Sequence, residues 1–291
     1  MKWKGNRASK NVEDARGRRV VAGGAGAGML LNLVGRTFGI KGILVLIVIG
    51  VIAWQAGLLD PTQLVGGAPQ SQSVDYQATP EEQERFDFVT VVLAYTEDVW
   101  QQEFARHNAQ YQEPTLVIYN RQVPTACGTG QSQMGPFYCP GDGKVYIDLS
   151  FYDELENAFN APGDFAQAYV IAHEIGHHVQ NLMGTSDKVH ARRGQADYNE
   201  YSVRLELQAD YYAGVWAHHK QQYLDVGDIE EAMRAANAIG DDAIQRKQQG
   251  KIMPHTFTHG TSEQRMRWFN KGFESGRIED GDTFSIPYKQ L

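Results

Sequence analysis

Residues 168–180 contain the pattern His-Glu-x-x-His, and this pattern constrains the chain more than any other stretch. The two histidines are His173 and His177, and apolar residues recur around them at three- and four-residue intervals. This spacing predicts a helix, on which residues four apart lie one turn apart on the same face. Glu174 projects about 100° further round that helix. Two imidazoles on one face can share a metal ion, and a carboxylate beside them can reach a water molecule, so the pattern indicates metal-assisted hydrolysis.

A catalytic zinc site needs a third protein ligand and one open position. The extended pattern His-Glu-x-x-His-x-x-Gly-x-x-His is excluded, because Gln180 and Met183 stand where it needs Gly and His. A helix predicted over residues 199–220 offers Glu206 and Asp210, four apart on one apolar face, where carboxylates need a partner. We expect Glu206 to be the third ligand and Asp210 to accept the outer N–H of a ligand histidine. The exchange of these two roles is the alternative.

The His-Glu-x-x-His pattern followed by Glu-x-x-x-Asp resembles the glutamate-ligand zincins, the gluzincins. The chain as a whole resembles the bacterial putative neutral zinc metallopeptidase family. The resemblance covers nearly the full length and rests on residues 3–14, 135–140, 172–181, 208–216 and 259–269. It implies an α+β, zincin-like metallopeptidase domain with a Zn²⁺ cofactor and a protein or peptide substrate.

A later segment, residues 257–265, resembles the His-Pro-x-x-x-x-Arg stretch of membrane-linked gluzincins, with Gly260 in place of Pro. The resemblance implies a catalytic role for His259, which would donate a hydrogen bond to the oxyanion formed from the substrate carbonyl. It also implies that Arg265 supports the site by holding Asp210 or another carboxylate. The alternative for His259 is a residue at a helix start with a local hydrogen bond.

Strands are predicted over residues 115–119 and 144–149, which are rich in β-branched and aromatic side chains. Tyr146 and Asp148 lie on the second strand, which we expect at the edge of the cleft, where an extended peptide could pair with it. His178 is expected to point away from the metal-binding face of its helix.

Cys127 and Cys139 are the two cysteines of the chain, and they flank a glycine-rich segment. A disulfide is the economical interpretation, because two thiolates without nearby partners make a poor zinc site. Disulfides persist in oxidising compartments outside the cytosol.

Charge is distributed unevenly along the chain. Residues 1–59 hold nine Lys and Arg against two acidic residues, whereas the remainder holds 18 against 33, a net charge of −15. An acidic body argues against binding to nucleic acid, because contact with phosphates depends on Lys and Arg.

Residues 42–59 form a run of 18 residues without a charge, about the minimum for spanning a bilayer. Lys41 precedes the run and Asp60 follows it, and Trp54 suits an interfacial position. The basic region before the run is longer than the usual start of a signal peptide, and no small-x-small cleavage site follows. We therefore expect an uncleaved, single-span signal anchor with a cytoplasmic N-terminus and an exported body. A buried core helix is the alternative.

The predicted organisation has four parts: a flexible, cytoplasmic leader over residues 1–41, one transmembrane helix over 42–59, a linker over 60–80 and the metallopeptidase domain over 81–291. Thr79 and the following Pro-Glu-Glu predict the start of the domain's first helix. The His-Glu helix is expected to begin near Asp164 as its cap. Shorter helices are predicted over 228–239, 242–249 and 262–273. The expected location is a bacterial cell membrane.

These features predict a membrane-anchored zinc endopeptidase in which Glu174 is the general base. A non-proteolytic, zinc-containing envelope factor for binding or quality control is the alternative. The intact glutamate favours the enzyme, because a site that no longer cuts has no evident need for a base.

Overall fold

The computed structural model describes residues 1–21, 70–73 and 75–291, which belong to two compact units. Met1–Arg16 and Tyr76–Leu291 form the larger unit, and Gly17–Asp75 belongs to the other. In the second unit, strands β2 (Arg18–Val21) and β3 (Gln70–Ser73) pair antiparallel. The predicted span over residues 42–59 lies outside the described residues. No described helix is both long and apolar enough to cross a bilayer.

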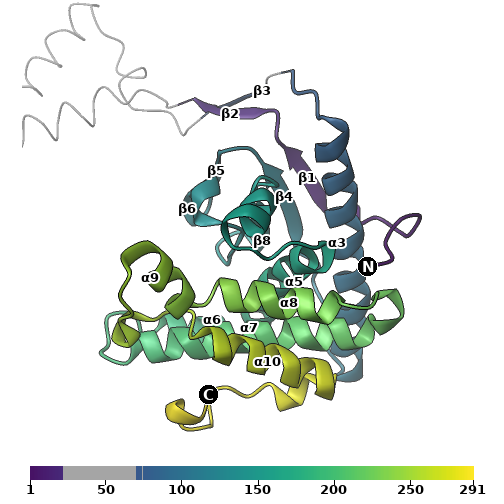
Figure 1. Cartoon of the computed structure of the whole chain (residues 1–291). Helices are drawn as coiled ribbons and strands as arrows, with labels where there is room; N and C mark the ends of the chain where they lie inside the picture. The colour runs from purple at the N-terminus through teal and green to yellow at the C-terminus, as the bar shows by residue number, and fades with distance from the viewer. Residues whose placement is uncertain (22–69, 74) are drawn as a thin grey trace, which may run out of the picture. The chain divides into compact units, whose positions relative to one another are not determined.

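A four-stranded sheet forms one layer of the larger unit (Figure 1). Its order is β1 (Val12–Ala15), β4 (Thr115–Tyr119), β8 (Lys144–Ile147) and β7 (Phe137–Cys139). The first three strands are parallel, and β7 runs antiparallel to β8. The sheet and the surrounding helices give an α+β fold, as predicted.

The strand over residues 144–149 is predicted at the edge of the cleft. In the structure β7 lies outside it, so β7 and not β8 is the edge strand. β8 lies between β4 and β7, and it ends before Asp148 rather than at residue 149. The Asp148 carboxylate accepts hydrogen bonds from the backbone N–H groups of Arg121 (2.7 Å) and Ser150 (3.0 Å). Such bonds from a short acidic side chain to nearby backbone groups favour a turn over a continued strand.

The predicted disulfide is confirmed: Cys127 and Cys139 are joined. It closes a loop that holds strand β6 (Gly128–Gln131), which pairs with β5 (Gln122–Thr125), and the short 3₁₀ helix η1 (Ser132–Met134). Because Cys139 belongs to β7, the bond ties this hairpin to the outer strand of the main sheet.

The first 16 residues are part of the larger unit and supply its strand β1, so a separate leader over residues 1–41 is wrong for this segment. Glu97 explains the docking, because this carboxylate is only 2% exposed and needs partners. It accepts hydrogen bonds from Arg7 (2.9 Å), Asn11 (2.9 Å) and the Ser9 hydroxyl. Trp3 adds an edge-to-face ring contact with Phe88.

This docking has a topological consequence for the predicted membrane span. Residues 1–16 and 76–291 fold together, so they lie on the same side of any membrane. One crossing between residues 16 and 76 would separate them. A cytoplasmic N-terminus with an exported body is therefore incompatible with this fold.

Helix α3 (Pro80–Arg106) begins as predicted, with Thr79 and Glu82 in a reciprocal capping box. Helix α5 (Asp164–Leu182) carries the His-Glu-x-x-His pattern, but Asp164 is its first residue and not its cap. The free backbone N–H of Phe165 is satisfied by the carboxylate of Glu231 at 3.1 Å, from a different helix. Asp164 instead accepts from the N-terminal ammonium group at 2.9 Å.

The remaining helices and helical turns complete the larger unit, and the longer ones lie on the side of α5 away from the sheet (Figure 1). They are α4 (Phe151–Asp153), the π-helical turn η2 (Glu154–Ala158), α6 (Thr185–His190), α7 (Tyr198–His219), η3 (Gln221–Tyr223), α8 (Asp228–Ala238), α9 (Asp241–Gln249), η4 (Pro254–Thr256), α10 (Ser262–Ser275), η5 (Ile278–Asp280) and η6 (Tyr288–Gln290).

Helices α5, α7 and α10 form the centre of the core. Gly214 and Gly272 let α7 and α10 touch along their backbones, because a Cβ at Gly214 would lie 2.0 Å from the Phe269 carbonyl oxygen. A Cβ at Gly272 would lie equally close to the Tyr211 carbonyl oxygen. This close packing places α7 between the other two helices, so that its side chains reach both.

Candidate active site

Three side chains from two helices converge at the centre of the larger unit. His173 and His177 come from α5, and Glu206 comes from α7. The Nε2 atoms of the two histidines are 3.2 Å apart. One Glu206 carboxylate oxygen lies 3.2 Å from Nε2 of His173, and the other lies 3.5 Å from Nε2 of His177.

These separations suit zinc. Bonds of about 2.0–2.1 Å in tetrahedral directions place neighbouring ligand atoms about 3.3–3.4 Å apart. The two Nε2 atoms, 3.2 Å apart, come close to that value, and each has one of the two Glu206 oxygens at 3.2 or 3.5 Å. Two imidazole nitrogens and one carboxylate oxygen are also a ligand set that catalytic zinc uses, with a fourth position left for water.

Gly176, inside the His-Glu-x-x-His pattern, allows the two helices to meet at this point. A Cβ at this position would lie 2.9 Å from the backbone oxygen of Ala209 and 3.0 Å from its Cα. Ala209 lies on α7 between Glu206 and Asp210, so this close approach of the helices falls at the level of the candidate ligands. The glycine therefore brings the α7 carboxylates within reach of the α5 imidazoles.

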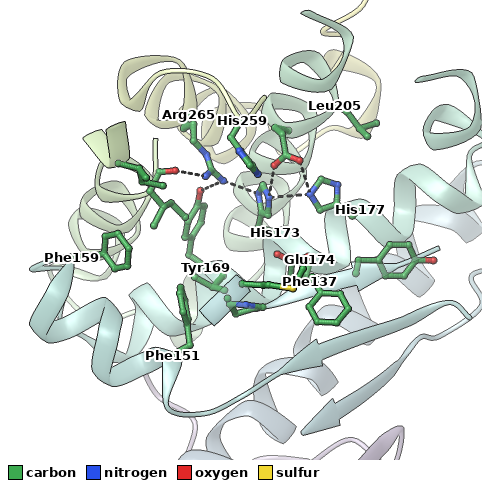
Figure 2. A pocket seen from close by; sticks show the side chains of 18 of the residues that line it. Phe137, Phe151, Phe159, Tyr169, His173, Glu174, His177, Leu205, His259 and Arg265 are labelled. Carbon is green, nitrogen blue, oxygen red and sulfur yellow. Dashed lines mark hydrogen bonds and ion pairs between the residues drawn. The ribbon is translucent and has the colours of Figure 1, made fainter. Parts of the chain in front are cut away.

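Asp210 contacts the outer nitrogen of His173, and it does so as one member of a buried network. Figure 2 shows three other members of that network, Tyr169, His173 and Arg265. Nδ1–H of His173 donates to the Asp210 carboxylate at 2.8 Å, and the Tyr169 hydroxyl donates to the same carboxylate at 2.6 Å. Arg265 donates to both Asp210 oxygens, each at 2.9 Å. The four side chains lock the His173 ring with Nε2 facing Glu206.

The charges in this network reinforce one another. Burial alone would raise the pKa of Asp210, but Arg265 and His173 outweigh it and lower that pKa to about 2. Asp210 is therefore a carboxylate that can only accept hydrogen bonds, which forces the proton of His173 onto Nδ1. Arg265 is 2% exposed and would be costly to bury without this carboxylate.

The outer nitrogen of His177 has a different partner, Gln180, which the sequence analysis used only to exclude the extended pattern. Nδ1 of His177 lies 2.9 Å from the Gln180 side-chain oxygen. Gln180 is fully buried and also bonds to the Leu205 backbone oxygen at 2.6 Å. The available signal was its position three residues after His177, on the same side of the helix.

Glu174 lines the same cavity as the three candidate ligands and is 8% exposed. Among the residues that the structure describes, no hydrogen bond or ion pair engages its carboxylate. Figure 2 shows Glu174 beside the imidazole cluster and turned into the cavity. An unengaged carboxylate in this place is free to take a proton from a water molecule at the candidate metal position.

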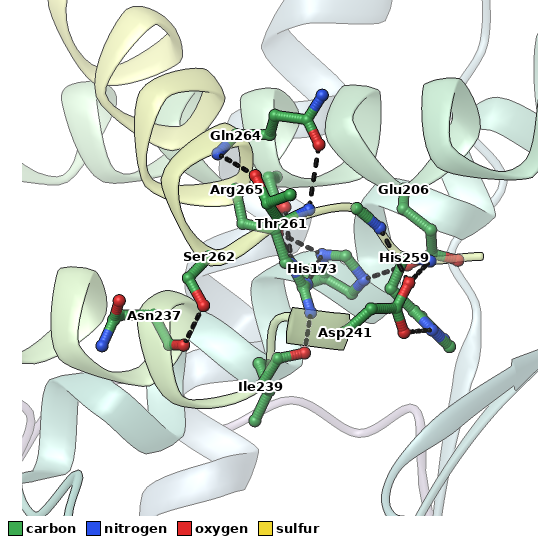
Figure 3. Close-up of polar contacts among 12 residues, drawn as sticks. His173, Glu206, Asn237, Ile239, Asp241, His259, Thr261, Ser262, Gln264 and Arg265 are labelled. Atoms are coloured by element: carbon green, nitrogen blue, oxygen red, sulfur yellow. Dashed lines mark hydrogen bonds and ion pairs between the residues drawn. The ribbon is translucent and has the colours of Figure 1, made fainter. Parts of the chain in front are cut away.

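His259 and Arg265 are both brought to the site, His259 from the loop before α10 and Arg265 from α10 itself. The charge of Glu206 raises the pKa of His259, and a hydrogen bond to Asp241 adds to this against the opposing effect of burial. Asp241 lies 3.3 Å from Nδ1 of His259 (Figure 3). His259 therefore lines the cavity and also has a local contact, with the Thr258 hydroxyl at 3.1 Å, while its catalytic role stays a prediction.

Asp241, at the start of α9, is a further residue that the sequence analysis did not select. Its carboxylate accepts the backbone N–H groups of Thr258 (2.7 Å), His259 (2.6 Å) and Gly260 (3.1 Å). Its own N–H donates to the Gly260 carbonyl oxygen at 2.9 Å. Gly260 has φ +90°, a conformation that glycine adopts readily and that proline cannot. This explains why the loop has Gly260 where the resemblance would have proline.

His178 is a buried local partner, directed away from the candidate ligands as expected. Its 4% exposed ring contacts the Tyr138 hydroxyl at 3.1 Å and the Gln112 backbone oxygen at 2.6 Å. Burial lowers the pKa of His178. Because Tyr138 belongs to β7, this contact fastens the outer strand of the sheet to α5.

The cavity has a volume of about 500 Å³, which lies within the usual range for ligand pockets. Apolar side chains line much of it, and Figure 2 shows Phe151 and Phe159 on the same side of His173 as Arg265. Five of the apolar residues that line the cavity, termed the apolar wall below, are Phe151, Phe159, Val170, Ile239 and Ile244.

A sequence model of the family described as "Putative neutral zinc metallopeptidase" matches residues 1–284. The chain belongs to this family. The match includes the N-terminal segment that supplies β1 as well as both helices of the candidate site. Membership implies zinc as the metal, in agreement with the cluster of two imidazole nitrogens and the Glu206 carboxylate.

Relatives of this family member occur in distant bacteria. The uncharacterized protein YpfJ of Escherichia coli (strain K12) is 49% identical over 293 residues, which cover 98% of this chain and 99% of that protein. The uncharacterized protein Rv2575 of Mycobacterium tuberculosis (strain H37Rv) is 43% identical over 188 residues, 60% of this chain and 64% of that protein. No solved structure matches the chain.

Proposed function

We propose that this protein is a zinc-dependent endopeptidase with His173, His177 and Glu206 as the metal ligands. The observation that carries the proposal is the cluster of two imidazole nitrogens 3.2 Å apart, each with a Glu206 carboxylate oxygen at 3.2 or 3.5 Å, beside the unengaged carboxylate of Glu174. Membership of the family supports a zinc peptidase, without specifying endopeptidase activity.

Zinc held by these residues would supply Lewis acidity, which lowers the pKa of water at the open position. Glu174 then accepts the proton of the attacking water at its carboxylate and passes it to the nitrogen of the leaving amine. His259 donates a hydrogen bond to the oxyanion that forms on the substrate carbonyl. Asp241 holds the loop of His259, and Asp210 holds the ring of His173.

Internal cleavage is favoured over removal of terminal residues. Recognition of a free carboxyl terminus needs a cation, but Arg265 is the one cationic side chain, histidines aside, among the described residues of the cavity, and Asp210 occupies it on two atoms. Recognition of a free amino terminus needs a buried acid that has no other role. Apart from the proposed base and the proposed ligand, Glu154 is the one acid among the described residues of the cavity, and it is exposed to solvent. An uncharged interior section of a peptide suits this cavity better than either end.

The apolar wall suggests the chemistry of the substrate near the cut bond. A wall of Phe, Val and Ile side chains gains free energy by covering an apolar side chain and loses free energy by desolvating a charged one. We therefore expect cleavage next to a large apolar or aromatic residue. The polypeptide backbone of such a substrate can pair with the outer strand β7.

We further propose that the folded unit lies on the exported side of a bacterial cell membrane, with the apolar run over residues 42–59 as the attachment. The disulfide between Cys127 and Cys139 supports an oxidising compartment. Since residues 1–16 belong to the same folded unit as residues 76–291, the chain must enter and leave the membrane on the same side.

The decisive experiment is cleavage of a peptide library by the zinc-loaded protein and by Glu174→Gln. We expect the variant to keep its zinc and its fold and to lose about 10²–10⁴-fold in rate, the usual contribution of a general base. Glu154→Gln, which changes a second glutamate of the same cavity, is the matched control and should retain the rate. Chelation should abolish cleavage and added zinc should restore it.

Two outcomes would count against the proposal. Cleavage by Glu174→Gln at the original rate would remove Glu174 from the role of base. A zinc-loaded wild-type protein that cuts no member of the library would favour the non-proteolytic envelope factor instead.

A further inference from the structure

We infer that Gln180 and Gln208 form a relay that sets which nitrogen of His177 faces the metal. The inference rests on the proposed role of His177 as a ligand. A histidine binds zinc through a nitrogen that carries a lone pair, so its proton must be on the other nitrogen. For His173 a buried carboxylate enforces this, but no carboxylate contacts Nδ1 of His177 among the described residues.

The orientation of each amide in the relay follows from backbone carbonyl groups, which can only accept hydrogen bonds. Gln208 lies 2.9 Å from the Gly281 carbonyl oxygen, so the atom on that side must be its NH₂ group. The side-chain oxygen of Gln208 is thereby directed to Gln180, which donates to it at 3.1 Å. Gln180 also donates to the Leu205 carbonyl oxygen at 2.6 Å, which independently places its NH₂ group on that side.

With its NH₂ group turned to Leu205 and Gln208, Gln180 can present only its oxygen to His177. This oxygen lies 2.9 Å from Nδ1 of His177. Nδ1 must therefore carry the proton and donate it, which leaves the lone pair on Nε2, directed at His173 and Glu206. The proton position is thus determined by two backbone carbonyls through two neutral side chains.

Burial fixes the orientation of both amides in the relay. Gln180 is fully buried and Gln208 is 7% exposed, so neither amide can rotate without leaving polar groups unpaired. The relay also joins three parts of the chain, because Gln180 lies on α5, Gln208 on α7 and Gly281 after η5. The C-terminal segment therefore contributes to the orientation of a candidate metal ligand about a hundred residues away.

The test combines zinc affinity with a direct measurement of the tautomer in the full-length chain. Gln180→Ala removes the acceptor, and we expect zinc affinity to fall about 10–100-fold, as for other outer partners of ligand histidines. Gln180→Glu keeps an acceptor for Nδ1–H while losing both donor bonds, so it should recover most of the affinity despite lower stability. Gln167→Ala, on the same helix at a partly exposed position, is the matched control and should leave the affinity unchanged.

Competition with a chromophoric chelator gives the affinity, and ¹⁵N NMR of the histidine rings in metal-free protein gives the tautomer. The signal of His177 is identified by its loss in His177→Asn. The wild type should show the proton on Nδ1, and Gln180→Ala should show a mixture of tautomers. Gln208→Ala should shift the balance less, because Gln180 keeps its bond to Leu205.

A proton on Nε2 in the metal-free wild type would overturn the inference, even if every variant failed to fold. Unchanged affinity and tautomer in a folded Gln180→Ala would overturn it as well. Neither measurement depends on hydrolysis. A protein that binds zinc and shows the expected tautomer but cuts no peptide would therefore contradict the proposed function while leaving the relay intact.

Discussion

Asp210 and Arg265 are buried side by side behind His173, and each depends on the other. Asp210 is fully buried and Arg265 is 2% exposed, so the loss of one partner leaves an uncompensated charge in the interior. Asp210 also holds the ring of His173, a candidate ligand. Loss of this pair should therefore affect both the stability of the fold and metal binding. Arg265 therefore acts through Asp210 rather than on a substrate.

We predict that Arg265→Met lowers the free energy of unfolding by about 3–5 kcal/mol, the usual cost of breaking a buried ion pair. Zinc affinity should fall too, because Asp210 is then protonated more easily and its hydrogen bond to His173 weakens. Chemical denaturation and chelator competition measure the two effects. Arg277→Met, at a largely exposed arginine, should change neither. Equal stability of both variants would show that the ion pair is dispensable.

The lowered pKa of Asp241 predicts that the stability of the folded protein depends on pH. Burial would raise the pKa of Asp241, but bonds from His259 and the Thr258 backbone outweigh burial, and the pKa lies below its usual value of 3.8. A carboxylate with a lowered folded-state pKa contributes stability above its unfolded-state pKa, and this stability is lost as the pH falls through the folded-state pKa.

We therefore expect Asp241→Asn to be less stable than the wild type at neutral pH and to lose less stability on acidification. Denaturation curves between neutral pH and about pH 3 measure this difference. Asp187→Asn, at an exposed position on α6, is the control. Parallel acid sensitivity of Asp241→Asn and the wild type would exclude a contribution from this carboxylate.

The crossing of α5 and α7 decides whether the side chains of the two helices meet. Both helices bury most of their residues, and the approach at Gly176 sets how near Glu206 comes to the imidazoles. The atoms closest to a Cβ at Gly176 belong to the backbone of Ala209, which cannot rotate away. A methyl group there can be accommodated only by moving a helix.

Gly176→Ala should therefore weaken zinc binding while the helix propensity of α5 improves. We expect overpacking to lower the free energy of unfolding by about 1–3 kcal/mol. We also expect a clear loss of zinc affinity, because the separations among the ligand atoms widen. Zinc titration together with far-ultraviolet circular dichroism checks both parts. Gln167→Ala on the same helix should bind zinc normally. Unaltered affinity in Gly176→Ala would mean that the crossing tolerates the methyl group.

The larger unit is assembled from both ends of the chain. Residues 1–16 add a strand to the sheet and partners to Glu97, and residues 276–291 pack against α7 through bonds such as that of Gly281 to Gln208. Removal of either end would leave buried polar groups unpaired in the centre. This organisation is also what constrains the path of the chain across a membrane.

Lys10→Cys and Lys251→Cys test that path, because both positions are exposed and the two native cysteines are joined. In intact cells, a membrane-impermeant maleimide should label both variants alike, since the two positions belong to one folded unit. Lysed cells provide the control for reactivity. Labelling of Lys251→Cys alone would favour the single-span anchor with a cytoplasmic N-terminus. Residues 1–16 would then lie on the opposite side of the membrane from residues 76–291.

Features that depend on near neighbours were predictable from the residues. The helical spacing around His173, the capping box of Thr79 and the pair of Glu206 and Asp210 on one helix face all follow from interactions within a turn or two. The disulfide was predictable because the chain offers only Cys127 and Cys139. Such patterns name the elements and the candidate ligands.

The strand β1, the cap of α5 and the relay through Gln180 were not predictable in this way. Glu13 and Asp14 give β1 a charged sequence, and it becomes a strand because β4 offers a free edge and Glu97 needs hydrogen-bond donors. Gln180 has no visible role until α7 brings the Leu205 carbonyl and Gln208 against it. The physical reason is common to these cases: a buried polar group must be paired, and its partner comes from a segment that only folding brings close.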